Sequence, residues 1–276
     1  MESIEAIEGK GYGPYPVRVC AEKVADFVRA TSDNPQRWTG YAPPGWAAAA
    51  LFVVAPRLLA DPQLGEASKS VIHGEQRFAW IRPIPLEADL LVIGNVPRVR
   101  SRGGVWFTTF EFEARDETGP VVNGTSTFLM AGTSPPASET DPVALALPQT
   151  RGSNDSLPEI REGFPTFKRS ASRSDLVRYA GATEDWNPVH WDHESAVAAG
   201  FPTIVVHGLL QAAWLLSAAS LLSDETAPIA EARFRFRSPM VAGSEATVVG
   251  EAKGQSASAR LVVGELDIVS ATMTLR

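Results

Sequence analysis

Residues 204–223 read IVVHGLLQAAWLLSAASLLS, an apolar stretch about as long as a membrane span. It contains His207 and Gln211 and directly follows Phe201-Pro202-Thr203 at the end of a polar loop. A helix that is apolar on nearly every side is also typical of the centre of a folded domain. Burying such a helix takes a curved sheet wrapped around it. We therefore interpret the stretch as the core helix of an α+β domain, and predict no membrane contact.

The first half of the chain repeats this arrangement. A second apolar segment covers Trp46–Ala60, and an Asn-Pro pair precedes each apolar segment, at Asn34 and Asn187. Further along, RFAWIRP from Arg77 aligns with RFRFRSP from Arg233 at an offset of 156. The two halves are therefore predicted to share one design, a long buried helix with an antiparallel sheet around it.

Shorter elements complete each half. A helical pattern precedes each Asn-Pro pair, over Ala21–Thr31 and Ser174–Ala182, and Ser172 to Asp175 fits a capping box for the second helix. Alternating or β-branched segments predict strands at 105–110, 121–130, 260–263 and 266–275. A Pro-, Ser- and Thr-rich segment lies between the halves and is typical of a linker. We predict domains at 1–135 and 159–276, with a linker at 136–158.

Composition limits the function classes. Hydrophobic residues make up 44% and charged residues 21%, which excludes a disordered chain. The formal charge of −7 argues against a nucleic-acid binder, because such proteins need a basic face. The single cysteine, Cys20, rules out an internal disulfide and fits a reducing compartment. The first five residues lack an apolar run, so we expect a cytoplasmic protein.

Three of the four histidines fall within eighteen residues, at 190, 193 and 207. Pro188 cannot extend a helix and pushes the preceding residue toward extended geometry, so Asp185 to His190 should form a loop. A loop can bring these two side chains together, and a carboxylate beside an imidazole is a common acid/base pair. Downstream, Val206-His207-Gly208 opens the buried helix, whose first N–H groups lack internal partners and attract negative charge. A glycine there allows an oxygen to approach closely, as an oxyanion site requires.

These residues carry a resemblance. The run YAGATEDWNPVHWD, followed by GFPTIVVHGLL, resembles the signature of the MaoC-like, (R)-specific enoyl-CoA hydratase/dehydratase family. The resemblance implies two hotdog domains in tandem, the first degenerate and lining the substrate tunnel. It also implies a catalytic dyad of Asp185 and His190, with the Gly208 N–H holding the thioester oxygen. We assign Asn187, which would orient the loop, together with His207 and Trp186 to the substrate-binding surroundings.

The implied reaction is syn addition of water to a 2-enoyl-CoA, giving a (3R)-3-hydroxyacyl-CoA, or the reverse dehydration. The enzyme would then be a carbon–oxygen lyase that needs no metal or organic cofactor. Its substrate would be a thioester of CoA or of acyl carrier protein. Because hotdog sheets commonly pair, a homodimer is also an expectation.

Two departures from the family pattern matter. Glu184 stands where the family usually has glycine before the aspartate, which would change the loop or bring a second charge to the dyad. In the first half, aligning the Asn-Pro pairs puts Trp186 opposite Asp33, and Trp38 falls where a histidine would be sought. We therefore predict a single active site per chain.

Alternative interpretations remain open at this stage. One is an acyl-CoA thioesterase on the same fold, and another is a non-catalytic subunit that binds acyl thioesters. His190-Trp191-Asp192-His193 also suggests a metal site, although no third and fourth ligands are evident. Trp186 and Trp191 fit either an acyl pocket or the core. Arginines recur at every second position in 98–102 and 233–237, and would contact CoA phosphates or face solvent.

Overall fold

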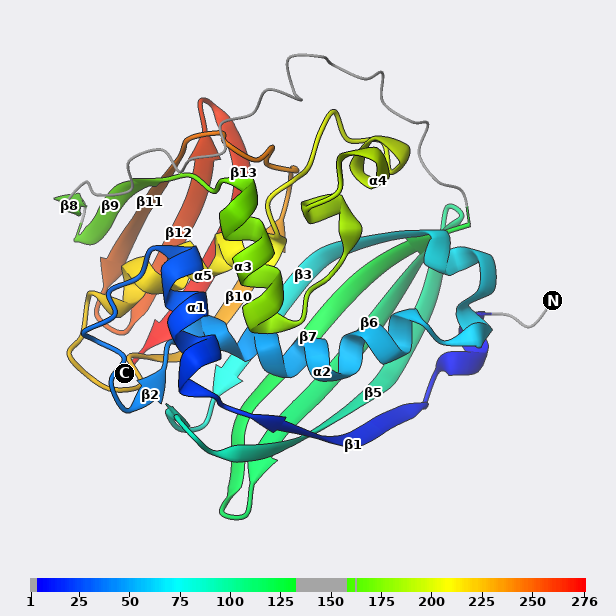
Figure 1. Ribbon diagram of the computed structural model, residues 1–276, viewed down its shortest axis with the longest axis horizontal. Coiled ribbons are helices and arrows are strands. Elements are labelled where there is room, and N and C mark those ends of the chain that lie inside the picture. Colours follow the sequence, from blue (N-terminus) through cyan, green and yellow to red (C-terminus); the bar gives the residue numbers. More distant parts are fainter. Residues whose placement is uncertain (1–3, 133–157, 162) are drawn as a thin grey trace.

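The computed structural model describes residues 4–132, 158–161 and 163–276 (Figure 1). One large antiparallel sheet runs through both halves in the order β1-β5-β6-β7-β3-β10-β13-β12-β11-β9-β8. Strands of the first half are β1 (Gly11–Arg18), β3 (Ser70–Trp80), β5 (Asp89–Arg102), β6 (Val105–Asp116) and β7 (Gly119–Ala131). Those of the second are β8 (Glu159–Arg161), β9 (Phe164–Arg169), β10 (Ile229–Phe236), β11 (Ala246–Lys253), β12 (Ser256–Val263) and β13 (Leu266–Leu275). The short strands β2 (Tyr41–Ala42) and β4 (Ile84–Pro85) pair separately.

The helices lie against one side of this curved sheet (Figure 1). They are α1 (Ala21–Thr31), α2 (Ala47–Leu59), α3 (Arg173–Thr183), α4 (His193–Ala198) and α5 (Gly208–Ser220). Short 3-10 turns are η1 (Ile4–Ile7), η2 (Pro44–Trp46), η3 (Pro62–Lys69) and η5 (Pro188–His190). The predicted α+β fold of two tandem hotdog units, each with a long central helix, is confirmed.

Helix α5 is the core helix that the sequence predicts, because every residue from Leu209 to Ser220 is buried. It is shorter than residues 204–223, since its approach segment is extended and bonded to the loop after β10. Val206 N–H donates to the Met240 carbonyl at 2.8 Å, and Ala242 N–H donates to the Ile204 carbonyl at 3.0 Å. Among the described residues no single helix is long and apolar enough to span a membrane; Pro44–Leu59 and Pro62–Ser68 meet the criterion only jointly, across a 94° bend.

The two halves share a strand pairing. Strand β3 pairs with β10, and Arg77 lies directly opposite Arg233. Each arginine makes a bidentate ion pair with a glutamate of the other strand, Arg77 with Glu231 and Arg233 with Glu75, at 2.6–2.9 Å. Residues related by the sequence offset of 156 therefore face each other about a pseudo-twofold axis between β3 and β10. The pairing of these two strands joins the sheets of the two halves into one.

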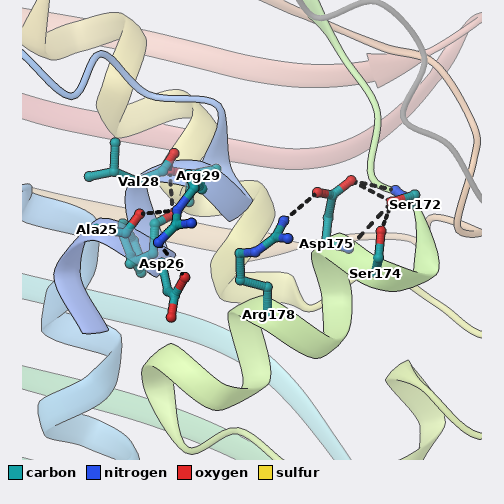
Figure 2. Close-up of polar contacts among 10 residues, drawn as sticks. Ala25, Asp26, Val28, Arg29, Ser172, Ser174, Asp175 and Arg178 are labelled. Atoms are coloured by element: carbon teal, nitrogen blue, oxygen red, sulfur yellow. Dashed lines mark hydrogen bonds and ion pairs between the residues drawn. The ribbon is translucent and has the colours of Figure 1, made fainter. Parts of the chain in front are cut away.

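Helices α1 and α3 pack against each other as the equivalent helices of the two halves. The predicted capping box begins α3: the Ser172 N–H donates to Asp175 Oδ2 at 3.0 Å and the Asp175 N–H to Ser172 Oγ at 3.3 Å. Figure 2 shows Asp175 also facing Arg178, one turn along the helix. Cap and ion pair together fix the start of α3.

The ends of α1 and α3 correct one prediction. Both helices have eleven residues, and each closes on a residue in the left-handed region, Ser32 (φ 55°) and Glu184 (φ 63°). The equivalence therefore runs at an offset of 152, so Asp33 corresponds to Asp185 and not to Trp186. The alignment on the Asn-Pro pairs was wrong by one position, because Trp186 is an additional residue inside the second loop.

Other predictions concern the connections. The predicted linker lies almost wholly within residues that the structure does not describe, so the domain boundaries stay a prediction. A short helix, α4, follows the His190 loop, and Gly200 comes soon after it at φ 88°. In the described first half, no helix of this kind separates α1 from η2.

Candidate active site

The loop between α3 and α4 brings Asp185 and His190 together. After Glu184 ends the helix, the Asp185 carboxylate accepts the backbone N–H of Asn187. The Asn187 side chain accepts the Val189 N–H at 3.4 Å, and Pro188 starts the 3-10 turn that carries His190. One ligand-type atom each from Asp185, His190 and His207 lie within 4.8 Å of one another. The predicted pair is therefore assembled by a helix end and a single turn.

A backbone carbonyl fixes the tautomer of His190. Its Nδ1 lies 2.8 Å from the carbonyl oxygen of Val205, which can only accept a hydrogen bond. Nδ1 therefore carries the proton, and Nε2 keeps a free lone pair. Val205 is held in turn, because its N–H donates to the Val189 carbonyl at 3.1 Å. His190 is thus presented as a base.

Burial moves both pKa values of the pair toward the neutral forms. Burial raises the pKa of Asp185 to about 7, although the hydrogen bond from the Asn187 N–H opposes the change. Burial also lowers the pKa of His190 to about 4, against the opposing bond to Val205. At neutral pH the site therefore combines a carboxyl that can hold a proton with an uncharged imidazole that can accept one.

His207 is fully buried behind the pair, as the last residue before α5. Its Nε2 donates to the backbone carbonyl of Asp185 at 3.3 Å, and its ring stacks on that of His190 with centroids 3.8 Å apart. Tyr179 packs on the other side, at 4.9 Å between ring centroids. All contacts of His207 described here are within the protein, so its role as a substrate contact stays a prediction.

Gly208 opens α5, as the sequence predicts. A Cβ at this position would lie 3.1 Å from Cε1 of Phe236, closer than most real contacts. A side chain at this position would therefore push the phenyl ring back by a few tenths of an ångström, whereas glycine leaves the space open. The first N–H groups of α5 have no acceptor within the helix, and the positive end of the helix dipole lies here. An oxygen with developing negative charge fits this position.

Glu184 does not add a charge to the pair. It adopts the left-handed conformation that glycine takes most easily, and its carboxylate forms an ion pair with Lys23 of α1. The same carboxylate accepts the Trp186 indole N–H at 3.1 Å. The loop geometry is therefore kept without glycine, and the extra carboxylate is bound at the surface between the two halves.

The two tryptophans of the loop are exposed, which rules out the core-packing interpretation. Trp186 is 49% and Trp191 38% exposed. Their indole N–H groups are bound within the loop, to Glu184 and to the Trp186 carbonyl at 3.3 Å. Both rings are therefore held in place while part of their surface stays open beside the acid/base pair.

The first half has kept only part of this arrangement. Asp33 accepts hydrogen bonds from Ser217 Oγ of α5 at 2.9 Å and from the Trp38 indole N–H at 3.1 Å. The ring that bonds Asp33 is therefore an indole, whose N–H can only donate, and not an imidazole. This pair cannot accept a proton from water through a ring nitrogen.

The geometry does not favour a metal at the three-residue cluster. Lone pairs of imidazole lie in the ring plane, so two stacked rings direct them side by side rather than toward one ion. In the other candidate run, Asp192 caps α4 through the Ser195 N–H at 2.8 Å, and Nδ1 of His193 bonds Thr203 Oγ1 at 3.2 Å. These side chains have structural partners in the fold.

Several residues of the site were not predicted. Tyr179, Val205 and Phe236 contact the predicted residues, and the ring of His73 of β3 packs at a tilt against Phe236, with centroids 5.0 Å apart. Tyr179 lies inside the quoted motif and Phe236 inside the repeated RFRFRSP, so their positions were visible and their roles were not. His73 comes from the other half, and no local pattern marks it. Of the arginine trios, Arg233 and Arg235 bind Glu75 and Arg237 bonds Ser270.

Comparisons with known proteins agree with this fold. The family model described as "MaoC like domain" matches residues 157–273. The chain is 28% identical over 234 residues to a peroxisomal multifunctional enzyme type 2 of Drosophila melanogaster, covering 80% of this chain and 38% of that protein. It is 36% identical over 77 residues to a mitochondrial 3-hydroxyacyl-[acyl-carrier-protein] dehydratase of Arabidopsis thaliana, covering 28% and 46%. The chain thus spans less than half the length of either relative.

A solved MaoC-like dehydratase superposes with a TM-score of 0.79 at 21% identity, covering 99% of both chains. This likeness extends over both halves, whereas the family model matches the half that carries Asp185 and His190. Residues 157–273 therefore form a MaoC-like domain, and the chain as a whole has the double hotdog fold.

Proposed function

We propose that this protein hydrates 2-enoyl thioesters to (3R)-3-hydroxyacyl thioesters, or catalyses the reverse dehydration. The observation that supports this best is the grouping of Asp185, His190 and the start of α5 around one point. It would provide an acid, a base and an oxyanion site, which are the three functions that the reaction needs. The names of the relatives are consistent with dehydratase chemistry on thioesters.

The pKa shifts suggest how the roles are divided. Nε2 of His190 would take a proton from water as its oxygen bonds to C3 of the substrate. The π electrons of the double bond would move to C2 and the thioester oxygen, and the Asp185 carboxyl would give its proton to C2. Transfer of the proton from His190 to Asp185 would then restore the neutral pair. Dehydration would follow the same steps in reverse.

The Gly208 N–H would stabilise the negative charge on the thioester oxygen. Loss of a single oxyanion donor typically costs about 3 kcal/mol of transition-state stabilisation. The glycine would also let the thioester approach the helix beside Phe236. A methyl group at this position would occupy the space that the oxygen needs.

Trp186 and Trp191 would bind the carrier part of the thioester at the surface. Rigid exposed indoles beside a reactive pair are well suited to contact a flexible ligand. Asn187 would act indirectly, because its described contacts hold the loop and the Asp185 carboxylate. Its assignment as a direct substrate contact stays a prediction.

The test is a spectrophotometric assay with crotonyl-CoA and a branched dicarboxylic enoyl-CoA, in which loss of enoyl absorbance and release of free thiol are followed together. We expect absorbance to fall without thiol release, and to stop falling in Asp185→Asn and His190→Gln. Gly208→Ala should retain the fold with strongly reduced kcat. Thiol release would indicate a thioesterase instead. Binding of both thioesters without any turnover would indicate a non-catalytic subunit.

A further inference from the structure

His207 contacts both members of the acid/base pair and is fully buried. It donates from Nε2 to the Asp185 carbonyl and stacks face to face on His190, with 25° between the ring planes. Its remaining nitrogen, Nδ1, has no hydrogen-bond partner among the described residues. The proposed reaction gives this histidine no role, so its contacts with Asp185 and His190 need a separate explanation.

The surroundings keep His207 uncharged. Burial lowers its pKa well below the usual value, and the neighbouring His190 lowers it further, since two stacked cations would repel. Asp185, His190 and Tyr179 lie around it, and the Tyr179 hydroxyl is also buried, with no hydrogen-bond partner in the part of the chain that the structure describes. Burial and the nearby Asp185 raise the pKa of Tyr179 well above its usual value, so this group also stays neutral. The ring under His190 is therefore a permanently neutral aromatic face.

A neutral aromatic face attracts a cation placed above it, most strongly where water is excluded. His190 becomes such a cation whenever it holds the proton of the attacking water. We propose that His207 is a positioning residue that stabilises protonated His190 through its ring face and holds the Asp185 backbone through Nε2. The catalytic part of this inference rests on the proposed function, because it needs His190 to be the base. The contact between the two rings does not depend on it.

Two substitutions separate the ring from the hydrogen bond. His207→Gln keeps an N–H donor toward the Asp185 carbonyl but removes the ring. His207→Phe keeps a ring under His190 but leaves the Asp185 carbonyl without its donor. His193→Gln is the matched control, because His193 lies in the same region and bonds Thr203 outside the stack.

We expect His207→Gln to lower kcat by about 10-fold, in the range of a buried cation–π contact. His207→Phe should stay within about threefold of the wild-type kcat but melt at a lower temperature, since it leaves a buried carbonyl unpaired. A purely structural role predicts the opposite order, with activity following stability. Equal loss in both variants, or full activity in His207→Gln, would overturn the proposal.

A second readout does not depend on turnover. NMR titration of the imidazole signals, assigned with His190→Gln, reports the pKa of His190 directly. It should fall in His207→Gln and change little in His207→Phe and His193→Gln. If no thioester is turned over, this pattern would still support the stacking interaction and only the proposed reaction would fail. An unchanged His190 titration in His207→Gln would refute the inference whatever the activity.

Discussion

Asp33 and Asp185 occupy the same place in the two halves, each directly after a helix of eleven residues that ends in the left-handed conformation. Their partners differ: Asp33 faces an indole N–H and a serine hydroxyl, whereas Asp185 lies near two imidazoles. The duplicated fold thus carries one aspartate with hydrogen-bond donors only and another beside a base.

This difference predicts that Asp33 contributes to stability and not to turnover. Asp33→Ala would leave three donors, from Asn34, Trp38 and Ser217, without their acceptor. We expect a loss of about 2–4 kcal/mol in unfolding free energy and little change in kcat below the melting temperature. Chemical denaturation and the crotonyl-CoA assay would measure the two effects. A kcat abolished by both Asp33→Asn and Asp33→Ala in folded protein would contradict a single active site per chain.

Asp185 should destabilise the protein at neutral and alkaline pH. Below about pH 4 its carboxyl is protonated in both the folded and unfolded states, so the raised pKa has no effect. Between pH 4 and 7 the unfolded chain ionises first, and the free energy of unfolding falls. The difference from 3.8 to about 7 corresponds to about 4 kcal/mol. Asp185→Asn should therefore be inactive but more stable than the wild type. Thermal melts should show that this gain in stability grows from pH 4 to 7 and is constant above pH 7.

The dependence of rate on pH distinguishes the acid from the base. If Asp185 supplies a proton to C2 and His190 accepts one from water, kcat/KM for hydration should fall above pH about 7 and below pH about 4. The loss of enoyl absorbance of crotonyl-CoA, measured across this pH range, would show both the fall at high pH and the fall at low pH. A rate that instead rises through pH 7 would show that ionised Asp185 is the base, and the two roles would be exchanged.

Glu184 should be replaceable by glycine without loss of activity. Glycine removes the cost of a left-handed residue, about 1 kcal/mol, while the exposed ion pair with Lys23 contributes at most a similar amount. We expect Glu184→Gly to stay within about 1 kcal/mol of wild-type stability and about twofold of its kcat. Glu184→Ala keeps a non-glycine residue in the left-handed conformation and loses the contacts with Lys23 and Trp186. It should therefore melt at a lower temperature. A large rise in activity in Glu184→Gly would mean that the carboxylate acts on the pair after all.

The exposed indoles should affect binding rather than chemistry. Trp186→Ala is expected to raise KM for crotonyl-CoA by about 3–10-fold, the effect of losing roughly 1 kcal/mol of aromatic contact. The kcat should change little, and the KM for the N-acetylcysteamine thioester, which lacks the nucleotide, should not change. Leu266→Ala is the control, since Leu266 is 53% exposed at the β12–β13 turn. An equal rise in KM for both thioesters would show that Trp186 contacts the acyl group and not the carrier.

Much of the fold was predictable because the strongest signals are local or repeated. Apolar segments as long as the one containing α5 need a sheet around them, and the Arg77 and Arg233 repeat marks equivalent strands. The Asp185 and His190 loop was predictable because Pro188 cannot extend a helix and so marks the segment before it as irregular. The additional residue Trp186 could not be recognised from the sequence. An alignment anchored on Asn34 and Asn187 contains no gap at this position and therefore pairs Trp186 with Asp33.

Contacts between elements that are distant in the sequence were not predictable. The stack of His207 on His190 depends on where α5 begins relative to a loop seventeen residues upstream, and hydropathy does not report ring orientation. His73 reaches Phe236 only because β3 pairs with β10, and either half alone would leave that strand unpaired on this side. Such features depend on tertiary packing, which local patterns in the chain do not encode.

The pairing of β3 with β10 also limits how the molecule can associate. Each half on its own would offer one of these strands as an open edge, and in this chain the two edges satisfy each other. The described sheet ends instead at β1, whose Pro14 and Pro16 cannot donate backbone hydrogen bonds, and at β8, which is three residues long. Both outer edges are therefore poor templates for a further strand. The duplication has closed the hydrogen-bonding capacity of the sheet within one polypeptide, and a second copy would have to associate through side-chain surfaces.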